Sequence, residues 1–197
     1  MKIDKIVAAI ILTISIFFLV RGYVGGMNIG REELAMNLDS IALENNIMLD
    51  ELKIKEANDS LFEVAVEIIK EFEGWHSAKH HPYVGYGHQL LKGDNFNSQI
   101  SEEFATELLK KDLRQKISEF KEYGKDSLIL GVLAYNIGEW KIKGGYGYKE
   151  SELSKAIKRK ASKEEIKRNY CSFRMYKGKV VKSIERRRNK EFNNIYL

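Results

Sequence analysis

The sequence has little cysteine and no linker of unusual composition. Cys171 is the only cysteine, which excludes a disulfide framework within the chain and a metal cluster held by several thiolates. No stretch rich in proline or glycine separates one part of the chain from another. The domain boundary that we expect near Asn58 therefore depends on a change of residue pattern alone.

Apolar and charged residues are both abundant. With 44% hydrophobic and 31% charged residues, the chain can build a core and is unlike a disordered protein. Its 197 residues suit one ordinary domain plus a leader or tether. The net charge of +5 favours an anionic partner, either nucleic acid, an anionic lipid surface or a bacterial wall polymer. No nucleic-acid-binding motif accompanies the basic residues, so we expect no nucleic-acid partner.

The N-terminal segment is typical of export. Two lysines precede an apolar run over residues 6–20, and Arg21 closes it. This run fits the core of a signal peptide and is short for a spanning helix of roughly 20 residues, although an anchor extended to Gly26 is the alternative. Either way the rest of the chain is expected outside the cytoplasmic membrane, periplasmic or extracellular. The expected divisions are 1–26 as signal peptide or membrane anchor, 27–58 as tether or packing helix, and 59–197 as the main domain.

A predicted helix ends on an acid. Asp59 or Ser60 can cap a helix over residues 61–72, and Gly74 is suited to stop it. At about 100° per residue, Glu73 falls inside the apolar arc of this helix, unlike the other acids of its second half. An apolar environment disfavours the charged form of a carboxyl, which makes Glu73 a candidate proton donor. A glutamate that turns back into water is the alternative.

An aromatic, glycine-rich turn follows this acid. Gly85 and Gly87 permit a sharp bend between residues that favour strand. Metal binding is an alternative for the histidines here, but Ser77 replaces the glutamate that zinc-protease helices place after the first histidine. We therefore expect no metal and no cofactor. All four histidines lie in or beside this turn: His76, His80, His81 and His88.

The order of several motifs carries a family resemblance. A helix ends in Glu73-Gly74, and Gly85-Tyr86-Gly87-His88 follows a short predicted hairpin. The later matching segments are residues 100–103, Asp112, residues 134–138 and residues 187–191. From about Leu61 to its end, the chain resembles the phage-type (endolysin-like) lysozymes of glycoside hydrolase family 24. This resemblance implies a predominantly helical α+β fold, lysozyme-like, with a small β-hairpin beside the cleft. It also implies cleavage of the β-1,4 bond between N-acetylmuramic acid and N-acetylglucosamine in peptidoglycan.

The resemblance assigns roles to single residues. Glu73 takes the position of the proton donor. Asp112 lies in the apolar stripe of a helix that Ser101 can cap, so it needs a partner, and His88 is the expected one. Pairing of Asp112 with a surface cation of its own helix is the alternative. Tyr86 and Asn136 are expected to bind substrate, although an asparagine that satisfies loop backbone is equally compatible with the sequence.

The chain departs from the family in the hairpin. The family has an aspartate and a threonine there, whereas no acid lies between Gly74 and His88 in this chain. Counting back from Gly85, Tyr83 stands at the threonine position and Ser77 at the aspartate position, and a deletion within the hairpin would instead bring His80 or His81 to the aspartate position. The candidate catalytic residues beside Glu73 are His80, His81 and Tyr83. The alternatives are that Asp94 reaches in, that the second role is dispensable in a lytic transglycosylase, or that the chain is an inactive wall-binding protein.

Two further segments have open interpretations. Residues 144–148 form an aromatic, glycine-rich loop that suits stacking on a sugar ring or serves as a connector. Basic residues dominate from Lys155 to Lys190 and include Arg187 and Arg188, which favours attraction to the anionic wall beside ordinary solvation. We expect a monomer whose partner is the glycan strand of peptidoglycan, with a membrane tether through the N-terminal apolar segment as an option.

Overall fold

In the computed structural model, the backbone is described from residue 31 and the side chains from residue 39. The chain divides into two compact units between Lys55 and Glu56. The leader or anchor expected over residues 1–26 lies outside the described residues. Among the helices of the described part, none combines the length and the apolar character that crossing a membrane requires.

Helix α2 (Arg31–Glu73) is much longer than the helix that the sequence predicts. The expected cap at Asp59 or Ser60 is wrong, because the backbone is helical on both sides of these residues. Neither glycine nor proline occurs within α2, and both polar side chains are exposed, so nothing forces the helix to begin there. Its predicted end is correct, since Glu73 is the last helical residue and Gly74 follows with φ +66°.

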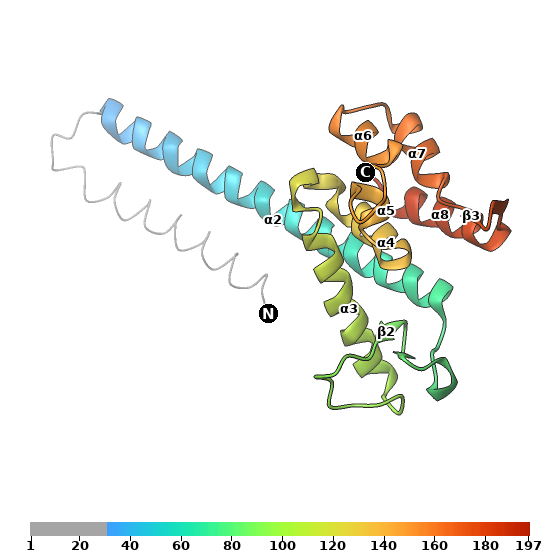
Figure 1. Cartoon of the computed structure of the whole chain (residues 1–197). Coiled ribbons are helices and arrows are strands. Elements are labelled where there is room, and N and C mark those ends of the chain that lie inside the picture. The colour runs from blue at the N-terminus through green and yellow to red at the C-terminus, as the bar shows by residue number, and fades with distance from the viewer. Residues whose placement is uncertain (1–30) are drawn as a thin grey trace. The chain divides into compact units, whose positions relative to one another are not determined.

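The unit from Glu56 to Leu197 is predominantly helical with two small hairpins (Figure 1), which confirms the α+β class. Strands β1 (Tyr83–Val84) and β2 (His88–Gln89) pair antiparallel, with Val84 opposite His88, and form the predicted hairpin. A second hairpin, of β3 (Met175–Tyr176) and β4 (Lys179–Val180), is not predicted by the sequence. The elements after α2 are η2 (Ala78–His80), β1 (Tyr83–Val84), β2 (His88–Gln89), α3 (Glu102–Ser118), η3 (Lys121–Asp126), α4 (Ser127–Ile137), α5 (Trp140–Lys143), α6 (Glu152–Lys158), α7 (Lys163–Cys171), β3 (Met175–Tyr176), β4 (Lys179–Val180) and α8 (Lys182–Ile195).

Helix α4 is the centre of the core. Its residues from Ile129 to Ala134 are all buried, which accounts for the almost wholly apolar sequence of this segment. Helix α3 packs closely on it, since a β-carbon at Gly131 would lie 2.5 Å from a side-chain carbon of Ile117. Ser101 caps α3 as predicted, its hydroxyl accepting from the Phe104 N–H at 3.2 Å. Helix α8 also contacts α4, so two distant parts of the chain meet at the end of this central helix.

Candidate active site

Glu73 lies at the C-terminal end of α2 and contacts two other helices. Its side chain is 19% exposed. Its Oε1 accepts a hydrogen bond from Nη1 of Arg187 on α8 at 2.7 Å, and a longer one from Nδ2 of Asn136 on α4 at 3.5 Å. The carboxyl is thus largely withdrawn from water, as predicted, but its immediate partners are polar. The sequence does not predict the guanidinium beside this carboxyl.

These contacts belong to a closed ring of polar side chains. Arg187 Nε donates to Glu191 Oε1 at 2.7 Å. Arg188 donates from Nη1 to the other oxygen of Glu191 and from Nη2 to Oδ1 of Asn136, which closes the ring at Glu73. Arg187 and Arg188 share the carboxylate of Glu191, and these three residues are buried. Such a network fixes the orientation of Glu73, because each charged member has a partner within hydrogen-bonding distance.

The ring corrects one expectation. The sequence predicts that Arg187 and Arg188 contribute to attraction of the anionic wall, yet both are buried and held by Glu191. Burial acts to lower the pKa of Arg187, but the carboxylates of Glu191 and Glu73 outweigh it and raise this pKa. Arg187 is therefore a permanent positive charge beside Glu73. The spacing of these arginines three and four residues before Glu191 is the sequence signal that indicates such pairs on a helix.

The backbone of the β1–β2 hairpin lies against the other oxygen of Glu73. A β-carbon at Gly87 would be 3.9 Å from Glu73 Oε2 and 3.8 Å from the Tyr135 hydroxyl. Tyr135 donates to the carbonyl of Tyr86 at 2.9 Å and so ties α4 to the hairpin. Burial raises the pKa of Tyr135 far above its ordinary value, so the phenol keeps its proton and remains a donor. Glu73 Oε2 therefore lies beside Gly87, whose φ of +97° favours glycine.

Tyr86 itself is buried between α2 and α3. Its hydroxyl donates to Glu102 Oε1 at 2.9 Å, and the Lys70 ammonium lies 5.1 Å from its ring centroid. Burial, followed by the hydrogen bond to Glu102, raises the pKa of Tyr86. These contacts fasten the hairpin to both helices. The predicted contact of Tyr86 with substrate stays a prediction, and so does that of Asn136, whose two amide atoms already bond within the ring.

His88 lies between two carboxylates. Its Nδ1 is 2.6 Å from Asp112 Oδ2 and its Nε2 is 3.4 Å from Asp94 Oδ2. The expected pair of His88 and Asp112 is therefore present and joins the hairpin to α3. The Leu91 N–H donates to Asp94 at 2.7 Å, and this bond is the main reason that the pKa of Asp94 is lowered. Asp94 is thus held by His88 and by its own loop.

The three predicted hairpin candidates lie apart from the ring. His80 Nδ1 accepts from the Ser77 N–H at 2.9 Å, so in the neutral ring the proton is on Nε2, which is then a donor and not a base. His81 is exposed. Tyr83 is exposed on β1, with its ring centroid 6.3 Å from that of His76. Among the described residues none of the three has a hydrogen bond to Glu73, and their catalytic roles stay predictions.

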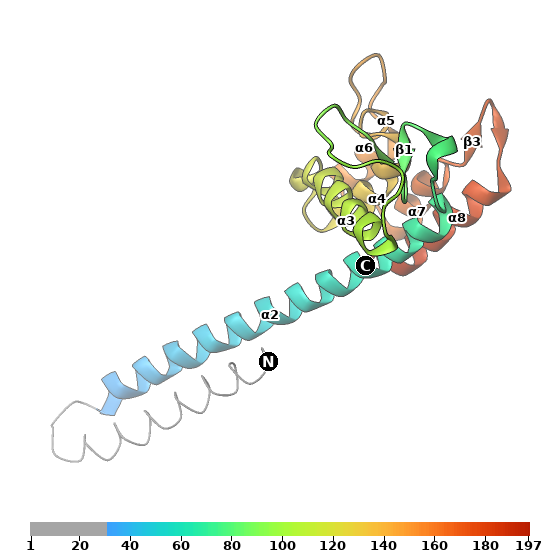
Figure 2. The ribbon, with the colours of Figure 1, turned by 90° about the horizontal axis from the view of Figure 1, so that it is seen from below.

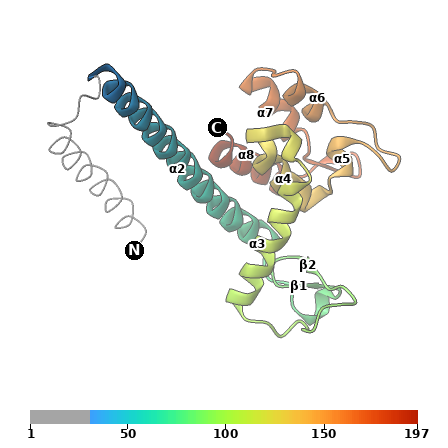
Figure 3. The same cartoon turned by 90° about the vertical axis from the view of Figure 1, so that its left-hand side faces the viewer.

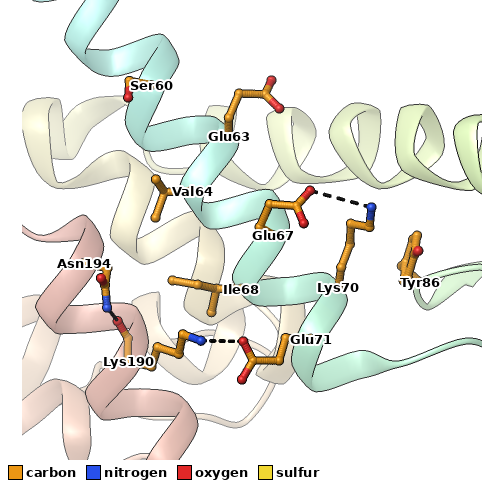
Figure 4. Close-up of a pocket in the computed structure, with 10 residues that line it drawn as sticks. All are labelled: Ser60, Glu63, Val64, Glu67, Ile68, Lys70, Glu71, Tyr86, Lys190 and Asn194. Carbon is orange, nitrogen blue, oxygen red and sulfur yellow. Dashed lines mark hydrogen bonds and ion pairs between the residues drawn. The ribbon is translucent and has the colours of Figure 1, made fainter.

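Two other kinds of site were considered in the described part of the chain, a metal site and a surface groove. Among residues 31–197, no group of three or more His, Cys, Asp and Glu residues is arranged to hold a metal ion. A groove of about 870 Å³ runs between α2 and α8, with Val64 and Ile68 as its apolar floor (Figure 4). An ion pair of Glu71 with Lys190 lies across it, and Glu73 is not among the residues that line it. The candidate active site is therefore distinct from this groove.

Replacing Gly87 with alanine tests the close approach of the hairpin to Glu73. The backbone at Gly87 has φ +97°, where a side chain is strained, and the added methyl group would lie beside Glu73 Oε2. We expect about 1 kcal/mol or more of lost stability in thermal unfolding, together with a larger fall in activity on purified cell walls. Gly93→Ala is the control, since a β-carbon there has no neighbour within 4 Å, and should change neither. An active Gly87→Ala protein would show that the space beside Oε2 is not used.

Comparison with known proteins agrees with this fold. Residues 70–191 match the family model of phage lysozyme, a span that includes Glu73 and Glu191. The muramidase domain of SpmX from Asticaccaulis excentricus has a similar fold, with TM-score 0.55 and 21% identity over 68% of this chain and 95% of that one. An endolysin from Escherichia coli O157:H7 phage FAHEc1 has TM-score 0.53 and 19% identity over 67% of this chain and 90% of that one. No curated protein matches the sequence. The chain belongs to the phage lysozyme family and is a glycoside hydrolase that cleaves peptidoglycan.

Proposed function

We propose that Glu73 is the general acid and that the bond cut is the β-1,4 linkage between N-acetylmuramic acid and N-acetylglucosamine. One observation supports this assignment above the others. The carboxyl ends a helix, one oxygen is held by Arg187 and Asn136, and the other lies beside Gly87 of the hairpin, where an added β-carbon would be 3.9 Å away. Such an arrangement orients one carboxyl oxygen toward a substrate while the rest of the group stays fixed.

In this proposal, Oε2 of Glu73 delivers the proton, and the hydrogen bonds to Oε1 support this choice. Both donors point at Oε1, so in the protonated acid this oxygen acts as the carbonyl acceptor and the proton resides on Oε2. Transfer of this proton to the glycosidic oxygen breaks the bond to the anomeric carbon. The negative charge left on Glu73 is then balanced by Arg187, whose own charge is permanent.

The second half of the reaction has two candidate courses. Glycoside hydrolysis ordinarily uses a second carboxylate to activate water or to attack the sugar. No acid lies between Gly74 and His88, and Asp94 is held by His88. In hydrolysis, a water molecule attacks the anomeric carbon. The hairpin residue His80, His81 or Tyr83 positions this water molecule. In lytic transglycosylation, a hydroxyl of the same sugar attacks and returns its proton to Glu73, which needs one acid only.

Product masses distinguish the two courses. Purified sacculi are digested with the wild-type protein, and the released muropeptides are weighed by mass spectrometry. Hydrolysis gives reducing muramic acid ends, which we expect for a member of this family. Anhydro ends, lighter by one water, would assign the chain to transglycosylation and would remove the need for a base in the hairpin.

Export and tethering belong to the same proposal. A cell-wall substrate lies outside the cytoplasmic membrane, which agrees with the leader or anchor expected over residues 1–26. We propose periplasmic or extracellular action by a monomer. Fractionation of cells that produce the full chain, followed by intact-mass measurement, distinguishes a cleaved leader from a retained anchor.

A further inference from the structure

Aromatic side chains gather at helix α5 and the loop that follows it. Trp140 begins α5, and Tyr146 and Tyr148 lie in the loop to α6. Tyr146 is 80% exposed and Trp140 is 40% exposed. Their ring centroids are 4.5 Å apart in an edge-to-face arrangement. Large rings that pack on each other yet remain in water indicate an interaction surface.

The loop holds these rings in a fixed arrangement. The N–H groups of Gly145 and Tyr148 each donate to the carbonyl of the other residue at 2.9 Å. Gly145 has φ +110°, and a β-carbon there would lie 2.9 Å from the Trp140 ring. A β-carbon at Gly144 would lie 2.8 Å from the backbone nitrogen of Glu150. Both positions therefore need glycine, and this close packing places Tyr146 beside the indole.

The two rings lie a short way along the chain from the candidate active site. Trp140 follows Asn136, whose amide contacts Glu73, by four residues. At about 3.3–3.6 Å per residue, their α-carbons are at most about 14 Å apart. The α5–α6 loop and the β1–β2 hairpin project from the same side of the unit 56–197 (Figures 2 and 3). A glycan strand bound at Glu73 is long enough to pass this loop.

We propose that Trp140 and Tyr146 form a subsite that binds a sugar ring of the glycan strand, away from the bond that is cut. A pyranose ring presents C–H groups on one face, and these pack well on an aromatic ring. Residues 144–150 contain no aliphatic side chain that would enter lipid, which favours a sugar over a membrane surface. This inference rests on the proposed function, because it takes the glycan strand as the substrate. It does not depend on Glu73 being the general acid.

The test measures binding and cleavage separately. Retention of the Glu73→Gln protein on insoluble sacculi is compared with and without Tyr146→Ala, so that binding is read without digestion. In the otherwise unchanged enzyme, Tyr146→Ala should raise KM on long glycan strands roughly two- to tenfold and leave kcat unchanged. Tyr146→Phe keeps the ring and should behave as wild type. Tyr176→Ala is the matched control, since Tyr176 is 62% exposed on the separate β3–β4 hairpin.

Each outcome bears on the subsite. Weaker retention and higher KM for Tyr146→Ala alone support it. The subsite would be overturned if Tyr146→Ala bound sacculi as well as wild type, or if Tyr176→Ala or Tyr146→Phe lost as much binding as Tyr146→Ala. It would also be overturned if Tyr146→Ala lost binding to anionic lipid vesicles but kept its binding to sacculi. A Glu73→Gln enzyme that still cleaves walls would refute the acid assignment only, because retention on sacculi is measured independently of the acid.

Discussion

Glu73→Gln should lower the rate of wall cleavage by about 10²–10⁴-fold, the usual contribution of a positioned general acid. The amide has the shape of the carboxyl, and its oxygen can still accept from Arg187 and Asn136. It has no proton to give to a leaving glycosidic oxygen. Release of soluble fragments from purified sacculi measures the effect. The fold should persist, because Arg187 keeps its hydrogen bond to Glu191.

Glu71→Gln is the matched control for this experiment. Glu71 lies on the same helix two residues earlier, is exposed, and pairs with Lys190 at the surface. Loss of such a pair should cost less than about 1 kcal/mol of stability and leave the cleavage rate unchanged. Wild-type activity in Glu73→Gln, or an equal loss in both variants, would remove Glu73 from the role of acid.

Short-range features of this fold were predictable from the sequence. The end of α2 at Glu73 and Gly74 depends on adjacent residues, and the Ser101 cap depends on a hydrogen bond to the backbone three residues later. The partner of Asp112 was predictable because a carboxylate in an apolar stripe needs one, and few candidates exist. The start of α2 was not predictable. A side-chain cap contributes only about 1 kcal/mol, and a helix without glycine or proline continues past residues that favour a cap.

The ring around Glu73 is the part that sequence reasoning missed. Arg187 lies 114 residues from Glu73, and helical spacing says nothing about contacts over such a separation. The apolar arc correctly placed Glu73 away from water, yet it could not show that the buried neighbour is a guanidinium. The turn at Lys177 and Gly178 between β3 and β4 was missed for another reason. Lys177 has φ +47°, a conformation that favours glycine or asparagine, so its residue type does not indicate this turn.

Glu191→Gln should be the most destabilising single change in the ring, at about 3–5 kcal/mol in denaturant unfolding. The Glu191 carboxylate is fully buried and accepts from Arg187, Arg188 and the Tyr170 hydroxyl. In the glutamine variant an NH₂ group replaces one acceptor oxygen, so one of the buried guanidinium groups faces an N–H donor. The negative charge that balances the buried guanidinium groups is also lost.

Because the same guanidinium groups hold Glu73 and Asn136, the Glu191→Gln protein should lose activity at temperatures where it is still folded. Glu152→Gln is the control, since Glu152 forms an exposed pair with Lys155 and its loss should cost at most about 1 kcal/mol. If Glu191→Gln unfolds at the same denaturant concentration as Glu152→Gln, the ring does not stabilise the fold. If it is destabilised yet fully active, Glu73 is oriented by contacts other than this ring.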